Sequence, residues 1–405
     1  MSRRLPGRMT WQAKARSLCP RRFGATGDGV TDDAPAFNRT LEKAADRGRG
    51  FVHIPAGTYR INSPLRVPRG VALVGESSSS SPRATLLLAE DGEGHPDGEP
   101  LITLEASSCL RSVTIHYPQQ RADRVVPYPW TIRVAGTHAG ILDLHITNAY
   151  QAIDLDGHAA SRHHVRNIRG QPLYRGLRIG QGAEMGKLEG VQFGPHWQHS
   201  EPVLHSMREL GIAFDIKDCD WEYVSNCSAT AYRIGFLFGA GTGGPSNALF
   251  TQCSSECRSA VRIEHVHEPA GVSFRRGSFN GGIEIGPKNS GPVRFSECSF
   301  GVAPPVQSVA VLQGRCPSVF AACDFHSWDH DCEDHPAIRL DQGSLTISDS
   351  RFLASGKRQV VAGPDATSLA IFTSQLRGGE RVEIAPGVDC QIGLNTYSDD
   401  ELSIR

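Results

Sequence analysis

Five aspartates have the residue type and spacing that suit a catalytic role. Asp154 and Asp156 alternate with apolar residues in one short segment, and Asp215, Asp218 and Asp220 lie in and just after a second segment of the same pattern. Two carboxyl groups cleave a glycosidic bond when they are about 5–5.5 Å or about 6.5–9.5 Å apart. The pattern therefore favours a glycoside hydrolase, with these five aspartates as candidate catalytic residues.

Other polar and aromatic residues nearby are candidates for proton transfer and substrate binding. His164 can donate or accept a proton near neutral pH, which makes it a sixth catalytic candidate. An aromatic side chain such as Trp197 can stack on a sugar ring beside an acidic groove. The candidates for substrate binding are Arg166, Arg178, Lys217, Glu222, His196 and Trp197. The predicted site thus covers residues 154 to 222.

A repeat of about 25 residues beyond Pro100 predicts a solenoid that stacks these side chains. In one strand type two apolar residues point inward and their neighbours outward. The outward positions form a first column of Asp154, Arg178, Asp215, Leu237, Arg262, Glu284, Val311 and Arg339, and a second of Asp156, Gly180, Lys217, Gly239, Glu264, Gly286, Gln313 and Asp341. Stacked strands are about 4.8 Å apart, which puts Asp154 and Asp215 about 10 Å apart. The first column is equally compatible with a non-catalytic ladder of ion pairs.

A second strand type predicts a column of small residues inside the solenoid. Its members are Cys227, Cys253, Gly277, Cys298, Cys323, Ser350 and Ser374. The column explains most of these cysteines as buried small side chains that pack turn on turn. Zinc ligation is disfavoured because Cys253 and Cys257 lack a matching second pair. No protein metal site is therefore predicted, and the polar cluster from Trp328 to His335 is interpreted as a solvated loop.

The N-terminal segment predicts a helix that covers the open end of the solenoid. Glycines in Gly27–Asp33 permit a tight turn, Thr31 or Asp32 can cap a following helix, and apolar residues from Ala36 to Ala45 share one helical face. The sequence predicts a disordered basic tail over residues 1–20, a capping segment over 21–75 and a parallel β-helix over 76–405.

The motifs Gly27-Asp-Gly-Val-Thr-Asp-Asp33 and Pro55-Ala-Gly-Thr-Tyr59 closely resemble the N-terminal signature of the pectate-lyase-like superfamily, which includes glycoside hydrolase family 28-related proteins and phage tailspikes. The resemblance implies an all-β fold, a single-stranded right-handed parallel β-helix with an N-terminal capping α-helix. A second stretch resembles uncharacterised bacterial members through Asn148-Ala-Tyr150, Arg162-His-His164, Gly170-Gln-Pro-Leu173 and His196-Trp197. The Asn-Thr-Asp, Gly-His-Gly and Arg-Ile-Lys motifs of polygalacturonases are absent, so pectin hydrolysis is not predicted.

The same superfamily leaves two alternatives to a hydrolase. Asp154, Asp156, Arg178, Asp215 and Lys217 resemble the acidic cluster and base of calcium-dependent pectate lyases, so a Ca²⁺-dependent β-elimination is one alternative. A non-catalytic glycan-binding or virion spike protein is the other. The superfamily includes both monomers and homotrimers.

Composition disfavours nucleic acid and membranes as partners, which leaves the oligo- or polysaccharide that the candidate site and the resemblance imply. The 42 basic and 43 acidic residues give no net field to attract nucleic acid, and no apolar run is long enough to span a membrane. The basic residues between Met1 and Pro20 are not followed by the apolar segment of a signal peptide. The cellular location is not predicted.

Overall fold

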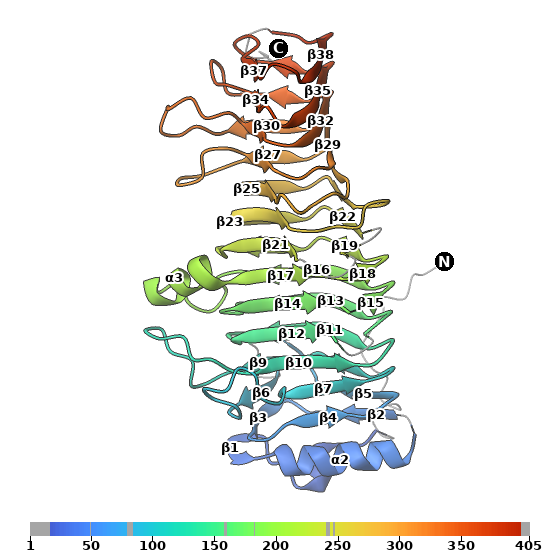
Figure 1. Ribbon diagram of the computed structural model, residues 1–405. Coiled ribbons are helices and arrows are strands. Elements are labelled where there is room, and N and C mark those ends of the chain that lie inside the picture. The colour runs from blue at the N-terminus through green and yellow to red at the C-terminus, as the bar shows by residue number, and fades with distance from the viewer. Residues whose placement is uncertain are drawn as a thin grey trace, which may run out of the picture.

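The protein is a long parallel β-helix closed at its N-terminal end by a helix (Figure 1). The computed structural model describes residues 17–48, 50–78, 84–157, 160–181, 183–239, 244–245 and 248–397. Within the described residues the main sheet contains 36 strands, and its strands pair in parallel, joining one turn of the coil to the next. Two helices accompany it, α2 (Ala34–Asp46) and α3 (Glu201–Leu210), with a short 3₁₀ turn at Pro20–Phe23. The all-β prediction is confirmed.

Three sheet faces run along the coil, and the first, the front sheet, faces the viewer in Figure 1. It contains β4 (Leu65–Val67), β7 (Ile102–Glu105), β10 (Trp130–Ala135), β12 (Gln151–Leu155), β14 (Arg175–Ile179), β17 (Ile212–Ile216), β21 (Ile234–Phe238), the ends of β23 (Ser254–Ile263) and β25 (Ser278–Ile285), β28 (Ala310–Leu312), β31 (Ile338–Leu340), β34 (Val360–Ala362) and β37 (Val382–Ile384).

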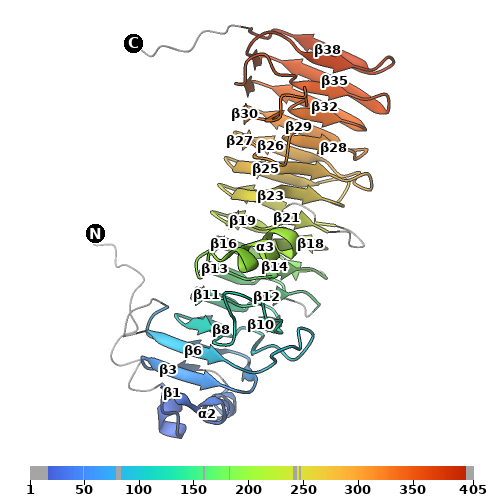
Figure 2. The same ribbon diagram turned by 90° about the vertical axis from the view of Figure 1, so that its left-hand side faces the viewer.

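The second sheet lies on the right-hand side of Figure 1 and the third sheet completes the coil, as the turned view in Figure 2 shows. The second contains β2 (Gly50–His53), β5 (Val71–Val74), β8 (Cys109–Arg111), β11 (Gly140–Ile146), β13 (His164–Gly170), β16 (Lys187–Phe193), β19 (Tyr223–Ser225), β22 (Ala248–Thr251), β24 (Val272–Arg275), β26 (Val293–Ser296), β29 (Pro317–Ala321), β32 (Gly343–Ser348), β35 (Ala366–Phe372) and β38 (Asp389–Gly393).

The third sheet contains β1 (Asp28–Asp32), β3 (Gly57–Ile61), β6 (Thr85–Ala89), β9 (Thr114–His116), the ends of β11, β13 and β16, β20 (Ser228–Thr230), the starts of β23 and β25, β27 (Ser299–Gly301), β30 (Asp324–Ser327), β33 (Arg351–Phe352) and β36 (Gln375–Leu376). A two-stranded sheet of β15 (Ala183–Glu184) and β18 (Cys219–Asp220) lies in the turns between the front and second sheets.

The strand register confirms the first predicted outward column. Asp154 pairs with Arg178, Arg178 with Asp215, and Arg262 with Glu284. The register continues through Val311 to Arg339. The spacing of apolar residues alone therefore predicted the parallel, in-register stacking of the turns.

Inside the coil, like side chains stack on like. Phe250, Phe274, Phe295 and Phe320 form a continuous series of stacked rings whose centroids are 4.8, 4.9 and 5.1 Å apart. Beside them the predicted cysteine column is present and buried. Burial raises the pKa of the Cys257 thiol to about 11 and that of Cys227 well above its ordinary value, so these thiols are poor nucleophiles.

The N-terminal motif forms a turn and a cap. The N-cap position of α2 is Asp33, whose buried carboxylate accepts hydrogen bonds from the backbone N–H groups of Thr26 and Gly27 at 2.7 and 3.1 Å. The predicted capping residue Asp32 accepts a hydrogen bond at 3.1 Å from the N–H of Ala34, the first residue of the helix. Asp28 binds the N–H groups of Val30 and Thr31, and these bonds lower the pKa of its carboxyl group. The aspartates therefore shape this turn.

Two of the predicted segments, the tail and the capping segment, can be compared with the observed strands. Residues 1–16 of the predicted tail lie outside the described residues, but Leu18 is bound on both sides by β2, through the N–H of His53 and the carbonyl of Phe51. The tail prediction is therefore wrong for residues 17–20. Strands β2 and β5, within the predicted capping segment, already pair into the continuous second sheet through β8.

The larger insertions project at the corner between the third and front sheets. They include residues 117–129, residues 194–211 with α3, residues 302–309 and residues 328–337, which form projections on the left of Figure 1. Between α3 and residues 302–309 the turns at this corner are short. At this corner the projecting insertions therefore form walls, and α3 and residues 302–309 are separated by a stretch in which nothing projects far from the coil.

Candidate functional site

The predicted catalytic aspartates lie on the front sheet but are engaged by arginines. Asp154 is fully buried, and its two carboxylate oxygens bind Arg133 Nε at 3.0 Å and Arg178 at 3.1 Å. Arg178 also lies 3.4 Å from Asp156 and stacks over the ring of Trp130. The ladder of ion pairs, one of the two predicted interpretations, describes this part of the sheet.

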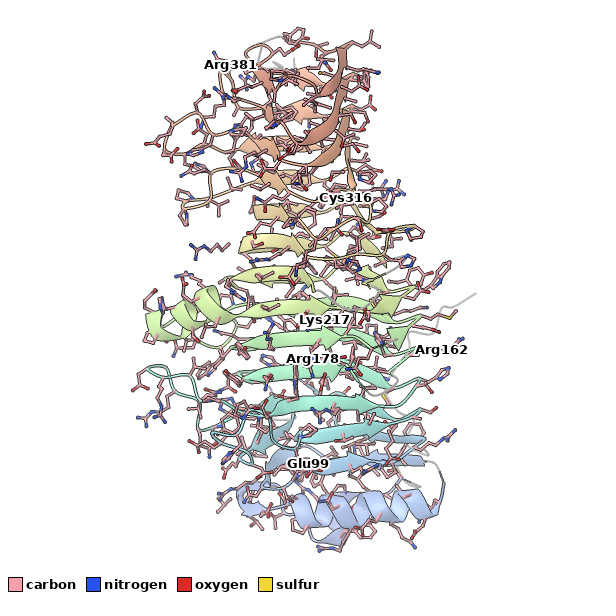
Figure 3. All side chains as sticks on the ribbon, viewed as in Figure 1. Glu99, Arg162, Arg178, Lys217, Cys316 and Arg381 are labelled. Atoms are coloured by element: carbon pink, nitrogen blue, oxygen red, sulfur yellow. The ribbon has the colours of Figure 1, made fainter. Side chains whose placement is uncertain are left out.

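Asp215 is similarly enclosed. It is 4% exposed, and its Oδ2 lies 3.4 Å from Lys217 Nζ and 3.5 Å from Arg175 Nη1. Arg178, between the two aspartates in the first column, forms ion pairs with Asp154 and Asp156. Figure 3 shows Arg178 and Lys217 on the same face, above one another on neighbouring turns. A substrate would have to displace these cations to reach either carboxylate.

Replacing Asp154 by asparagine is expected to destabilise the fold by about 1–3 kcal/mol, because both arginines lose a charged hydrogen-bond partner in a buried position. Chemical denaturation measures this change. A variant of unchanged stability that has lost turnover of a substrate would instead assign Asp154 to catalysis.

The other predicted residues do not gather around Asp154. His164 and Arg166 lie on β13 in the second sheet, where His164 Nε2 is 3.1 Å from Glu189. Glu222 is wrong as a substrate-binding residue, because it is fully buried against His163 at 3.0 Å. Asp218 and Asp220 lie in the turn between the front and second sheets, and Asp218 accepts a hydrogen bond from Gly244.

The His196–Trp197 loop is held by buried Gln171. The Oε1 of Gln171 accepts hydrogen bonds from the backbone N–H groups of Trp197 and Gln198 at 2.7 and 2.9 Å. Trp197 is partly buried against the core. Burial and the nearby Arg169 lower the pKa of His196, whose Nδ1 lies 3.2 Å from Arg169. This part of the bacterial resemblance therefore marks residues that anchor an insertion.

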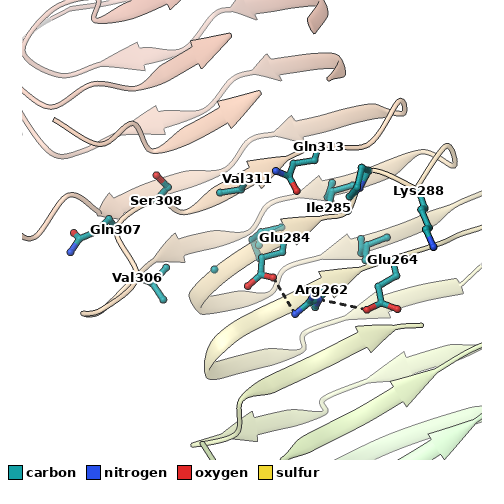
Figure 4. A pocket seen from close by; sticks show the side chains of 15 residues that line it. Arg262, Glu264, Glu284, Ile285, Lys288, Val306, Gln307, Ser308, Val311 and Gln313 are labelled. Carbon is teal, nitrogen blue, oxygen red and sulfur yellow. Dashed lines mark ion pairs between the residues drawn. The ribbon is translucent and has the colours of Figure 1, made fainter. Parts of the chain in front are cut away.

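A hollow opens farther along the same front sheet. It has a volume of about 610 Å³ and lies over β23, β25 and β28, with the insertion Val306–Ser308 on one side and the turn Gly286–Lys288 on the other (Figure 4). Arg262, Glu264 and Glu284 point into it. We call it the carboxylate groove.

The two glutamates of the carboxylate groove bracket one guanidinium group. Glu264 Oε1 lies 3.7 Å from Arg262 Nε, and Glu284 Oε2 lies 3.6 Å from Arg262 Nη1. The side chains of Glu264 and Glu284 are 41% and 44% exposed, in contrast to those of Asp154 and Asp215 at 0% and 6%. Because both oxygens lie close to one planar group, they are at most about 10 Å apart, which includes the separations used for glycosidic cleavage.

Both glutamates belong to the outward columns that the sequence predicted. The catalytic residues were instead predicted on the N-terminal turns, because charged residues are concentrated there. Two features mark the groove instead. Gly286 follows Glu264 in the second column, on the next turn, and Gly282 lies two residues before Glu284, so these two positions next to the glutamates carry no side chain. Residues 302–309 supply a wall, which is fixed where Gln307 accepts a hydrogen bond from Asp329 and binds the N–H of His330.

The polar cluster after Trp328 supports this wall. Trp328 is buried, and its Nε1 donates a hydrogen bond to the carbonyl of Arg358. Within the described part of the chain, Asp329, Asp331 and His335 are the one set of three His, Cys, Asp or Glu side chains with donor atoms all within 4.8 Å of one another. Asp329 is already bound by the N–H of His335. The loop lies five turns from the His196–Trp197 loop, as predicted.

The family comparison agrees with the fold. Residues 20–94 match the family described as rhamnogalacturonase A/epimerase, pectate lyase-like. This match and the parallel coil confirm the predicted resemblance to the pectate-lyase-like superfamily.

The chain is similar to several kinds of protein. It is 24% identical over 340 residues to a glucan 1,3-beta-glucosidase of Cochliobolus carbonum, covering 70% of this chain and 41% of that protein. A mannuronan C5-epimerase of Azotobacter vinelandii is 42% identical over 60 residues, covering 13% of this chain and 3% of that protein. The chain therefore spans less than half of the length of these curated relatives.

Among solved structures, the tailspike protein of E. coli bacteriophage HK620 superposes with a TM-score of 0.60 at 12% identity, covering 96% of this chain and 77% of that one. The bacteriophage phi29 gene product 12 gives 0.58 at 13% identity, covering 94% of this chain and 56% of that one. These similarities show the fold. Within the described ranges, no helix has the length and apolar character needed to cross a membrane.

Proposed function

We propose that this protein binds a glycan in the carboxylate groove and hydrolyses a glycosidic bond there, with Glu264 and Glu284 as the catalytic pair. The proposal rests on one observation: two half-exposed carboxylates face a hollow of about 610 Å³ and bracket a single arginine. The similarity to a glucan 1,3-beta-glucosidase supports a carbohydrate substrate.

The arrangement supplies the groups that hydrolysis needs. One carboxyl group must protonate the leaving oxygen while the other, ionised, activates water or attacks the sugar carbon. Arg262 stabilises negative charge on whichever carboxylate is ionised. The side chains of Gln313 and Lys288 at the rim can bind sugar hydroxyl groups. No metal ion takes part in this scheme.

The test is a product assay on a panel of polymers that includes β-1,3-glucan, alginate and polygalacturonate. We expect new reducing ends from at least one polymer, and a loss of at least about 100-fold in turnover for Glu284→Gln and for Glu264→Gln. The matched control is Glu105→Gln. Glu105 also pairs with an arginine, Arg66, but lies on β7 outside the groove.

Two results would contradict hydrolysis at this groove. Full activity in both glutamine variants would put the site elsewhere. Binding of a polymer, lost in the variants, with no new reducing ends would favour the non-catalytic binding protein.

The calcium-dependent lyase remains testable in the same assay. Its product absorbs in the ultraviolet and its formation would stop on chelation, whereas hydrolysis by two glutamates is expected to continue in EDTA without an unsaturated product. The predicted lyase cluster has less support, because Asp154 and Asp215 are occupied by arginine and lysine.

A further inference from the structure

A second hollow lies around the corner from the carboxylate groove. It has a volume of about 700 Å³ and occupies the open stretch between α3 and the insertion at residues 302–306. Arg208 and Glu209 of α3 line one end, and Val302–Val306 line the other. We call it the corner hollow.

The two hollows meet at the same residues. Val306 lines both, and Gly281 of the corner hollow is followed directly in the chain by Gly282 of the carboxylate groove. Position 281 accommodates only glycine, because a Cβ on Gly281 would lie 1.9 Å from the carbonyl oxygen of Cys257. The two hollows are therefore adjacent, with Val306 and the backbone of Gly281 and Gly282 at their boundary.

The lining of the corner hollow suits sugar hydroxyl groups and ring faces. Arg258, Glu256 and Asn280 supply donors and acceptors from strands β23 and β25. The exposed rings of Pro304 and Pro305 offer flat apolar surface. An ion pair at 3.7 Å between Arg258 Nη1 and Glu209 Oε1 ties α3 to the strand and fixes the far wall. Acidic and basic groups are balanced, which favours a neutral ligand over a polyanion.

We propose that the corner hollow is a second glycan-binding subsite, and that one linear chain runs from it over Gly281 into the carboxylate groove. The inference rests on the proposed function of that groove and adds to it. The substrate is a linear oligo- or polysaccharide long enough to occupy both hollows, with neutral sugars preferred. The two walls, α3 and residues 302–306, set where the chain enters.

The test measures binding and cleavage of fragments of each panel polymer, from about two to about eight sugar residues, by wild type and by Asn280→Trp. Asn280 is an exposed strand residue of the corner hollow, so a large ring there fills the hollow without entering the core. We expect affinity for the longest bound fragments to fall at least about tenfold, with the shortest cleaved fragments little affected.

The matched control is Ser278→Trp. Ser278 is exposed on the same strand, two residues earlier, and outside both hollows, so its variant should bind long and short fragments as wild type does. Equal affinity of wild type and Asn280→Trp for every fragment would overturn the subsite while the proposed function stands. Binding of long fragments that Asn280→Trp weakens, without cleavage of any polymer, would keep the subsite and overturn hydrolysis. Failure of every fragment to bind wild type would overturn both.

Discussion

Replacing His163 by alanine is expected to lower the free energy of unfolding by about 3–5 kcal/mol, because the change leaves the carboxylate of Glu222 buried without its partner. Both residues are at most 1% exposed, and His163 Nε2 lies 3.0 Å from Glu222 Oε1. His163 Nδ1 lies 2.8 Å from the carbonyl oxygen of Ala160. A doubly protonated imidazolium ring can donate a hydrogen bond to each of these two oxygens.

This pair also predicts a pH dependence of stability. Burial by itself would lower the pKa of His163, but the Glu222 carboxylate and the Ala160 carbonyl raise it above the ordinary value of 6.5. A raised folded-state pKa stabilises the protein fully below the unfolded-state pKa, and that stabilisation is lost as the pH rises through the folded-state pKa. The contribution of His163 should therefore be larger at about pH 6 than at about pH 9.

Chemical denaturation at these two pH values, on three variants, tests both statements. His164→Ala is the matched control, because its neighbouring pair with Glu189 is exposed and should contribute less than about 1 kcal/mol. In Glu222→Gln the amide can donate to a neutral His163, so we expect a smaller loss, about 1–2 kcal/mol, and a weaker pH dependence. If the free energy of unfolding of His163→Ala lies within about 1 kcal/mol of the wild-type value, His163 and Glu222 do not form a buried ion pair.

Replacing Phe295 by alanine is expected to destabilise the C-terminal half of the coil by about 3–5 kcal/mol. Its ring stacks between Phe274 and Phe320, with centroids 4.9 and 5.1 Å away, and is 1% exposed. The deletion removes contacts to the turns on both sides and leaves a cavity in an interior that cannot collapse without shifting the strands.

Because each turn contacts its neighbours only, the effect should spread along the axis from the site of the change. Hydrogen exchange is expected to increase first in β24, β26 and β29. Phe51→Ala serves as the control, since Phe51 is 52% exposed and its loss should have a small effect. Protection factors unchanged in these three strands would show that the stacked rings do not couple the turns.

The sequence by itself determined the fold to the level of single strand positions. Apolar residues at alternate positions, repeated at each turn, predicted that Asp154, Arg178 and Asp215 would stack in one outward column, and they do. The cysteine column followed from the same alignment. These features are recoverable because a solenoid repeats one local interaction, so that the period in the chain equals the period in space.

Tertiary structure alone decided which part of the outward column is open. Asp154 and Glu284 occupy equivalent positions, yet arginines from the turns on both sides enclose Asp154, while Glu284 faces a hollow walled by residues 302–309. The sequence also did not indicate that His163 and Glu222, which are 59 residues apart, form a buried pair. Side-chain burial depends on where insertions fold and which charges meet across turns, and a pattern of residue types along one strand does not carry that information.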